Sequence, residues 1–571
     1  MESSVAARKP LDVGTGRVCA SFGATSAGWL SLGAPHAAHG FVELAGGPPF
    51  DERRRGSPAA TRAHRERLAL ADEAFLAITD ADGALLLEPD VSDPYRPAWR
   101  GPGIAVEAWG DEGGTIITQH WSSDRPLRVT LGGRLDRPAL AEITELDPPA
   151  STGATTELHA DGTRARVVAP ALPAAVTVEL RGSAWRPDGE GLVGDMPAGE
   201  WIVTARIGEP EAGRPWPQTP VADPLVTRAL AYVRGCTALS IGPDERVILT
   251  DHRLLPLSWT RDAYWQARLL LAADGPGDRQ RVADHLRWLW RRCERPDGRW
   301  VRSHHANGRR KDRAFQADQQ LYPLVELADY WRLGGSLPDG VNWTDAVAGA
   351  WDAVTSAVDP STGLMATHEN AADDPAEAPF IAASQILLWH AAGRLTELHD
   401  AGALTAPFAH GVAERVRAAF GRHLVHDDRW AYASDGAGNH VDYHDANDLP
   451  LALAPAWGFC TADDPAWVAT VDVAFSARNP GYAAGPRGGL GSVHTAGAWT
   501  LGDVQRWIVA RATGDADAAE EALQRLRDVA FLDGMLPEAY SATGHPDVRI
   551  RHWFAWPGAA LGALLLAGSS R

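Results

Sequence analysis

The sequence predicts a chain of two parts, an N-terminal antiparallel β-sandwich followed by an (α/α)6 barrel. Three features support this prediction: short β-branched segments fill the first third, a proline-rich stretch follows, and segments of helical length fill the rest. At 571 residues the chain exceeds the usual size of one compact core, which favours two domains. We therefore expect a β-sandwich over residues 1–208, a linker over 209–224 and a barrel over 225–571.

Short alternating segments recur between about Gly16 and Gly208. Apolar and β-branched residues alternate with polar ones, and Gly, Pro and Asp bound each segment, which is typical of antiparallel strands. The segments are RVCASFGA, GALLLEPDV, GTIITQHW, LRVTLGG, RARVVAP, AAVTVELRG and GEWIVTARIG. The stretch EPEAGRPWPQTPVADP then predicts an extended linker, because proline disfavours helix at the residue before it.

Twelve Ala- and Leu-rich segments of helical length follow the linker. They cover about 225–236, 261–273, 277–294, 315–332, 343–357, 379–398, 405–422, 447–456, 464–477, 498–513, 516–529 and 553–567. A helical solenoid should show a sequence repeat, and none is detectable, so six hairpins closing into a double-layered barrel fit better. In such a barrel the loops before the inner helices converge on the axis, so we expect the ligand site there.

The composition favours a folded protein with an uncharged ligand. Hydrophobic residues make up 45% and charged ones 22%, as in average globular proteins. The net charge of −19 repels phosphate backbones and anionic membranes, so we expect neither nucleic acid nor a membrane as partner. The four cysteines lack the spacing of a zinc site or a disulfide framework, and no signal peptide or long apolar run is evident. We expect a cytoplasmic protein without metal or cofactor, of open oligomeric state.

Tryptophan is unusually frequent, with 23 Trp against 9 Tyr and 12 Phe. Indole rings stack on sugar rings while the N–H group donates to a hydroxyl, which suits a carbohydrate site. Large helical cores also use tryptophan, so both interpretations stay open.

Five groups of loops combine acids, histidines and tryptophans beyond what turn chemistry requires. An Asp in a first helical turn is commonly a cap, which explains Asp262 well but not the neighbouring Arg and the two Trp, and capping also stays open for the second loop. An Arg–Asp pair can also hold the neighbouring hydroxyls of a sugar. The first loop, PLSWTRDAYWQ, and the second, AFQADQQLYP, supply the candidates Trp259, Arg261, Asp262, Trp265, Asp318 and Gln319.

The third loop, THENAADDPAEAPF, places Asp373 beside Asp374. A turn before a helix explains adjacent acids. Like charges close together also raise one pKa, which keeps a carboxylic acid protonated for general acid catalysis. The last two groups, DGAGNHVDYHDANDLP and then GGLGSVHTAGAWTLGD with GMLPEAYSATG and RHWFAW, supply the candidates His444, Asp445, Asn447, Asp448, His494, Trp499, Glu538, Arg551 and Trp553, and the closing motif also contains Trp556.

Six motifs follow one another in the order of a known family. WTRDAYWQ is similar to Trp-x-Arg-Asp-Ser, FQADQQLYP to Glu-x-Asp-Ser-x-x-Tyr-Pro, AADDPAEAPF to Pro-Ser-Asp-Asp-Ala and HDANDLPLAL to Asp-Asp-Ala-Asn-x-Pro-Ser-Leu-Leu. GLGSVHTAGAWTLG continues the series, and LPEAYS with RHWFAW closes it. After about residue 255 the chain thus resembles the glycoside hydrolase family 125 exo-α-1,6-mannosidases, (α/α)6 barrels that act without metal and invert the anomeric centre.

This resemblance implies a general acid from the Asp373/Asp374 pair and a general base at Glu538. If Glu538 is not the base, Asp445 and Asp448 are the next candidates. His444 departs from the pattern, because it stands where the family has the first Asp of Asp-Asp-Ala-Asn. The N-terminal β domain also departs from it and looks more like bacterial glucoamylases and related α-glucosidases.

We therefore expect an inverting exo-α-glycosidase that releases a terminal hexose, mannose or glucose, from an α-linked oligosaccharide or small glycoside. One alternative is a sugar phosphorylase, in which phosphate replaces the base and the water, so that an anion-binding cluster should replace Glu538. The other is a non-catalytic carbohydrate-binding homologue, which should have lost the paired acids.

Overall fold

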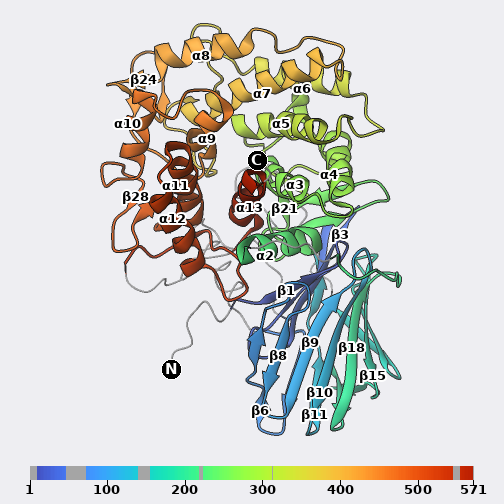
Figure 1. The fold of residues 1–571 in the computed structure, drawn as a ribbon. Helices are drawn as coiled ribbons and strands as arrows, with labels where there is room; N and C mark the ends of the chain where they lie inside the picture. The colour runs from blue at the N-terminus through green and yellow to red at the C-terminus, as the bar shows by residue number, and fades with distance from the viewer. Residues whose placement is uncertain are drawn as a thin grey trace.

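The structure, a computed structural model, describes residues 9–46, 73–138, 155–217, 223–311, 313–543 and 553–569. Within these ranges the long strands end at Ile207, and twelve α-helices follow from Pro224 onward. The strands gather at one end of the helical part (Figure 1). This order confirms the predicted fold class.

Two antiparallel sheets form the β domain. The first follows the order β1-β2-β3-β5-β11-β17-β16, with β4 and β12 added at β3 and β6 added at β5. Its strands are β1 (Leu11–Gly14), β2 (Cys19–Phe22), β3 (Trp29–His36), β4 (Gly40–Ala45), β5 (Leu76–Asp80), β6 (Gly83–Ala84), β11 (Leu127–Leu131), β12 (Arg134–Asp136), β16 (Arg186–Asp188) and β17 (Gly191–Met196).

The second sheet follows the order β13-β14-β15-β18-β10-β9-β8-β7. Its strands are β7 (Glu88–Asp90), β8 (Ala98–Gly101), β9 (Ile104–Gly110), β10 (Ile116–Ser123), β13 (Glu157–Asp161), β14 (Arg164–Val168), β15 (Ala175–Arg181) and β18 (Gly199–Ile207). Burial alternates along β9 and β10, as the period of a strand with one buried face requires. Gln119 on β10 accepts hydrogen bonds from the indoles of Trp29 and Trp121, which joins the two sheets.

Six inner helices form a closed ring in the barrel, because each contacts the next and the last contacts the first. Their order is α3 (Thr260–Ala273), α5 (Ala317–Gly334), α7 (Ala382–Asp400), α9 (Leu449–Trp457), α11 (Thr500–Thr513) and α13 (Ala555–Ser569). Figure 1 shows α13 near the centre of the helical part, beside α3.

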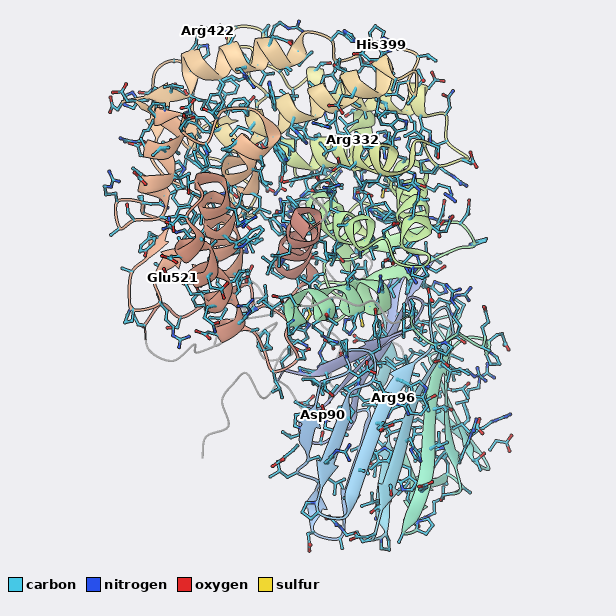
Figure 2. The ribbon with its side chains drawn as sticks, viewed as in Figure 1. Asp90, Arg96, Arg332, His399, Arg422 and Glu521 are labelled. Atoms are coloured by element: carbon cyan, nitrogen blue, oxygen red, sulfur yellow. The ribbon has the colours of Figure 1, made fainter. Side chains whose placement is uncertain are left out.

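The other six helices form the outer layer: α2 (Pro224–Tyr232), α4 (Asp278–Arg287), α6 (Trp343–Thr355), α8 (Val412–His423), α10 (Pro465–Ala474) and α12 (Ala516–Val529). Turns of π-helix at Val233–Thr237 and Trp288–Arg292 extend α2 and α4, close to the predicted ends. Helix α8 begins at Val412 rather than near 405, because residues 401–411 form a loop. Exposed charged side chains such as Arg96, Arg422 and Glu521 cover the outside of both parts (Figure 2).

Short two-residue or three-residue strands connect the helices near the barrel ends. They are β19 (Ala238–Ser240), β20 (Arg246–Ile248), β21 (Leu257–Ser258), β22 (His304–His305), β23 (Phe380–Ile381), β24 (Val425–His426), β25 (Arg429–Trp430), β26 (Ala433–Ser434), β27 (His440–Val441), β28 (Tyr482–Ala483), β29 (Gly489–Leu490), β30 (Ala498–Trp499) and β31 (Ala539–Tyr540). None of the helices in the described ranges is long and apolar enough to cross a membrane.

The two layers of helices begin differently. Four outer helices, α2, α6, α10 and α12, start at an Asp or Asn whose side chain accepts a backbone N–H, as helix caps do. The inner helices α3, α5, α7, α9 and α11 have no such side-chain cap. Asp318, in the first turn of α5, accepts the backbone N–H of Gln319 and also bonds to Arg261.

The described part of the linker packs on the β domain. Arg214 pairs with Glu112 through the backbone, and the Trp216 indole donates to the carbonyl oxygen of Gly110 at 2.8 Å. These contacts hold residues 209–217, which contain no helix, against the β domain.

Candidate active site

A pocket opens where the inner helices begin. Eight of the residues predicted from the sequence line it: Trp259, Arg261, Asp262, Asp373, Asn447, His494, Trp499 and Glu538. They come from the loops or first turns of α3, α7, α9, α11 and α13. The convergence of these loops brings together side chains that lie up to about 280 positions apart in the sequence.

Arg261 is the central cation of the pocket floor. Its Nη1 donates to Asp318 at 2.9 Å, and its Nη2 lies 3.8 Å from Oδ1 of Asp373. Its guanidinium also lies over the Trp556 ring, 4.7 Å from the ring centroid. Although burial alone lowers its pKa, the neighbouring carboxylates outweigh this and raise the pKa of Arg261. Arg261 is therefore a fixed positive charge.

Asp262 lies beside Arg261 in the first turn of α3, where its Oδ2 is 3.6 Å from the Arg261 Nε, and it does not cap the helix. Its Oδ1 accepts from the Thr250 hydroxyl at 2.6 Å, while Oδ2 accepts no hydrogen bond from the described residues. Burial raises the pKa of Asp262 to about 6, against the opposing effect of Arg261. Asp262 therefore borders the pocket beside Arg261, with Oδ2 held by charge rather than by a hydrogen bond.

The loop before α7 presents Asp373 to the pocket. Asn370 is buried, and its Oδ1 accepts the backbone N–H groups of Ala372 and Asp374 at 2.9 and 3.0 Å. Asp373 itself has φ of 67°, a left-handed conformation that Asp tolerates better than most residues. This turn directs the carboxylate of Asp373 to the Trp259 indole at 3.2 Å and to the Gln316 amide at 2.6 Å.

Asp374 faces a different partner, His494. The His494 Nδ1 lies 3.3 Å from Oδ2 of Asp374. Burial alone lowers the pKa of His494, but the bond to Asp374 and the charge of Glu538 outweigh it, so the pKa is raised. His494 therefore lies beside Asp374, and the charges of Asp374 and Glu538 favour its protonated form.

Glu538 is held rigidly on the wall formed by the loop before α13. It follows Pro537, which bridges to Trp553, and it precedes β31, which pairs with β30. Its backbone carbonyl oxygen accepts from the Thr500 N–H at the start of α11, and its side chain is only slightly exposed. Glu538 and Trp499 therefore share one wall of the pocket.

Asp445 ties two pocket loops together from below. Its Oδ1 accepts from both the backbone and the side-chain nitrogen of Asn447 at 2.8 Å. Its Oδ2 accepts from the hydroxyls of Tyr443 and Ser492. Asn447 lines the pocket, and Ser492 lies two residues before His494, which also lines it. The Asp445 carboxylate therefore holds these two loops in position relative to each other.

The comparisons with known proteins agree with this geometry. A family model described as "Metal-independent alpha-mannosidase (GH125)" matches residues 345–566. The chain is a glycoside hydrolase. The matched range includes the loops of Asp373, Asn447, His494 and Glu538, so the resemblance predicted from the sequence is confirmed there. No curated protein sequence matches the chain.

Two solved structures show how the fold of the hydrolase compares. A Streptococcus pneumoniae protein, described as a metal-independent alpha mannosidase in non-productive complex with alpha-1,6-mannobiose, has 19% identity and a TM-score of 0.53, and the match covers 60% of this chain and 93% of that one. A bacterial glucoamylase complexed with acarbose has 11% identity and a TM-score of 0.64, covering 99% and 94%. The second match spans both parts, so a β domain before the barrel is a shared fold.

Several predicted binding residues of the hydrolase lie behind the pocket wall. Asp318 pairs with Arg261, and the Gln319 Oε1 accepts from Thr260 and from the Arg261 backbone. Burial lowers the pKa of His444 to about 4 and raises the pKa of Asp448 well above its ordinary value. Seven of the predicted site residues are buried outside the pocket lining: Trp265, Asp318, Gln319, His444, Asp445, Asp448 and Trp553. An eighth, Asp374, is half-buried and also lies outside the lining. Arg551 lies outside the described residues.

Other pocket residues were not among the predicted binding residues. Thr250, Leu255, Lys311 and Phe554 line the pocket, and Gln316 orients Asp373. Trp556, which the closing motif suggested, also lines it. Gln316 could have been found from its place just before the α5 start, but no local pattern marks Thr250, Leu255 or Lys311.

Proposed function

We propose that this hydrolase is an inverting, exo-acting α-glycosidase that releases a terminal hexose, with α-mannosides as the first substrates to test and α-glucosides as the second. The observation that carries the proposal is a pocket with carboxyl groups from two separate loops, Asp373 and Glu538, among three tryptophans. The GH125 match favours mannose as the terminal sugar, and the fold shared with a glucoamylase makes glucose the second candidate. The ligand is an α-linked oligosaccharide or small glycoside.

Hydrolysis with inversion needs a proton donor at the leaving oxygen and a carboxylate that activates water on the opposite ring face. We assign the donor to Asp373, because it lines the pocket whereas Asp374 lies against His494. Glu538 is the water-activating base. The two carboxyl groups should then be about 6.5–9.5 Å apart in the substrate complex, the separation that leaves room for water.

The remaining pocket residues hold the sugar. Trp259, Trp499 and Trp556 offer indole faces to the ring, and Arg261, Asp262 and Asn447 offer donors and acceptors to its hydroxyls. Asp318, Gln319 and Asp445 act through these residues by holding them in place. Binding roles for Trp265, His444, Asp448, Trp553 and Arg551 stay predictions.

The packed barrel beneath the pocket supports the exo mode. Core side chains of the inner helices, including Leu321, Leu387 and Val504, fill the barrel interior. We therefore propose that a chain end, and not the middle of a polysaccharide, enters the pocket. We keep the proposed division into a β-sandwich (1–208), linker (209–224) and catalytic barrel (225–571), and a cytoplasmic location stays a prediction from the cysteine pattern.

A substrate panel with one variant tests the proposal. Purified full-length protein is incubated with α-linked disaccharides and aryl α-glycosides of mannose and glucose, with and without inorganic phosphate. We expect phosphate-independent release of a single hexose. Glu538→Gln should reduce kcat by about 10²–10⁴-fold, the usual contribution of a general base, with little change in KM. Full activity of Glu538→Gln, or turnover that requires phosphate, contradicts the proposal.

A further inference from the structure

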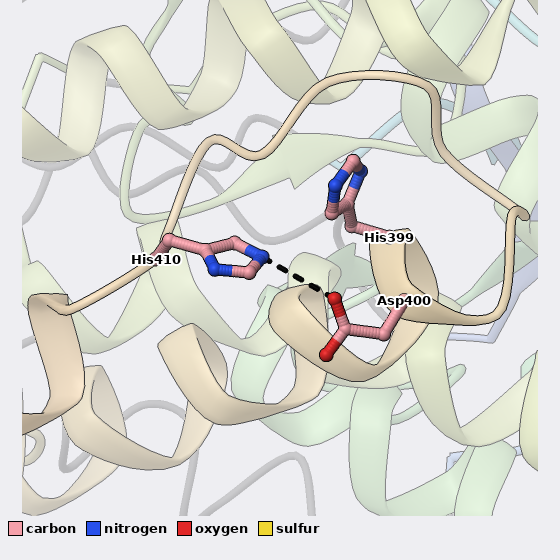
Figure 3. A group of neighbouring side chains, drawn as sticks. All are labelled: His399, Asp400 and His410. Atoms are coloured by element: carbon pink, nitrogen blue, oxygen red, sulfur yellow. Dashed lines mark ion pairs between the residues drawn. The ribbon is translucent and has the colours of Figure 1, made fainter.

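A group of possible metal ligands lies on the outside of the barrel, away from the pocket. His399 and Asp400 end α7, and His410 lies in the following loop (Figure 3). One ligand atom from each of these side chains lies within 4.8 Å of the other two. In the part of the chain that the structure describes, this is the one group of three His, Cys, Asp or Glu side chains that converges in this way.

The three side chains are already arranged as ligands. Nε2 of His410 lies 3.4 Å from Oδ1 of Asp400, close to the spacing of two donors on one tetrahedral zinc ion. Nδ1 of His399 lies 3.2 Å from the carbonyl oxygen of Leu404. Such a bond fixes the tautomer of a ligating histidine and leaves Nε2 for the metal.

The loop that carries His410 is anchored at both ends, so little order must be gained on binding. Leu404 and Ala409 are buried in the barrel core. Thr405 contacts the hydroxyl of Thr344 on α6. Gly402 donates its backbone N–H to the carbonyl oxygen of His399, which closes the helix end directly beside the ligands.

We propose that His399, Asp400 and His410 form a surface site for a divalent transition-metal ion, with zinc as the best match. Two imidazoles and one carboxylate suit zinc, whereas calcium and magnesium prefer oxygen ligands alone. Three protein ligands on an exposed surface leave further positions for water. The bound ion links the end of α7 to the loop before α8.

The site stabilises the barrel and takes no part in hydrolysis. Helix α7 has 19 residues, so at 1.5 Å per residue it places Asp400 about 28 Å from the end next to the acid loop. A ligand that binds only the folded state stabilises that state. Zinc should therefore raise the Tm while leaving turnover unchanged.

Zinc titration of the full-length protein after removal of metals by a chelator tests this site. Calorimetry should show one equivalent of Zn²⁺ in the wild type and at least about tenfold weaker binding in His399→Ala and in His410→Ala. His426→Ala is the matched control, because His426 also pairs with an aspartate, at 3.2 Å, but belongs to no convergent group of three in the described chain.

Two further readouts separate this site from others. Zn²⁺ should raise the Tm of the wild type and of His426→Ala but not that of His410→Ala. Co²⁺ bound at this site should lack thiolate charge-transfer absorption, which excludes the cysteines as ligands. Wild-type affinity in both His399→Ala and His410→Ala, or loss of the zinc equivalent in His426→Ala, overturns the proposal, and activity of the chelator-treated enzyme is a separate test of the proposed function.

Discussion

Asp373 and Asp374 are neighbours in the sequence but face different partners in the structure. Asp373 lies in the pocket against Trp259 and Gln316, whereas Asp374 pairs with His494. The left-handed backbone at Asp373 accounts for this difference, because it turns successive side chains in different directions. The adjacent acids in the sequence suggested a shared function, and only the loop geometry separates them.

Separate substitutions should distinguish the acid from its neighbour. Asp373→Asn should reduce kcat on an α-linked disaccharide by about 10²–10⁴-fold. It should retain most activity on the corresponding α-glycosyl fluoride, because fluoride leaves without protonation. Asp374→Asn should affect both substrates to a similar extent. Initial rates on the two substrates distinguish the two residues, and a defect in Asp374→Asn on the disaccharide that spares the fluoride makes Asp374 the acid instead.

At the scale of elements, the helices were predictable and the pocket lining only in part. Ala- and Leu-rich segments of helical length predicted all twelve described helices. We also expected the loops before the inner helices to converge, and eight of the candidate residues from these loops line the pocket. Capping was the main alternative for Asp262 and Asp318. Asp262 bonds to the Thr250 hydroxyl, and Asp318 bonds to Arg261 as well as to the backbone N–H of Gln319 in its own first turn. Thr250 and Lys311 reach the pocket through tertiary packing alone, so their local sequence carried no signal.

The loop before α7 should depend on Asn370. Asn370→Ala removes the acceptor of two backbone N–H groups, so Asp373 should lose its alignment, and misplacement by about 1 Å can cost about 10²-fold in rate. We expect a fall in kcat of that order with a smaller change in KM, and recovery in Asn370→Asp, which keeps an acceptor oxygen. Asn342→Ala, which removes the exposed cap of α6, should lower stability by about 1 kcal/mol and spare kcat. Equal kinetic effects of the two alanine variants argue against a positioning role.

Helix α5 carries a buried carboxyl group whose effect depends on pH. Neither oxygen of Glu326 has a hydrogen-bond partner among the described residues, and the nearest histidine nitrogen, of His285, is 3.9 Å away. Burial, and to a lesser extent Asp329, raises the pKa of Glu326 well above its ordinary value. The folded state therefore keeps a proton that the unfolded state releases above about pH 4.5, so stability falls as pH rises.

Glu326→Gln should remove this penalty. The Tm difference between Glu326→Gln and wild type should grow from pH 5 to pH 7, because the penalty rises by about 1.4 kcal/mol per pH unit at most. Thermal unfolding at three pH values measures it. Glu521→Gln on the exposed surface of α12 controls for the substitution itself. A difference that stays constant with pH shows that Glu326 is ionised in the folded protein.

At the scale of the whole molecule, the tryptophan excess had two origins. Trp259, Trp499 and Trp556 line the pocket, as a sugar site requires. Others fill the cores of both parts, such as Trp121, which stacks on Trp201 in the β domain at 5.0 Å. The count alone therefore indicated large cores as much as a carbohydrate ligand.

The two parts are joined by a buried ionic cluster that the sequence did not reveal. Lys9 contacts Asp12 of β1 at 2.9 Å and Asp533 of the barrel at 2.7 Å, and Arg228 of α2 also bonds to Asp533. Breaking such a buried group is costly, so the β domain and barrel are fixed to each other. Partners separated by more than 500 positions leave no local pattern, which is why this contact could not be predicted.

The stereochemistry of the first product tests the central claim most directly. An α-linked disaccharide that the enzyme cleaves is followed by proton NMR in the first minutes of reaction, before the free sugar mutarotates. An inverting enzyme with Asp373 as acid and Glu538 as base should release the β-anomer of the hexose first, and Glu538→Gln should abolish that signal. Initial release of the α-anomer, or undiminished β-anomer from Glu538→Gln, contradicts the assigned mechanism.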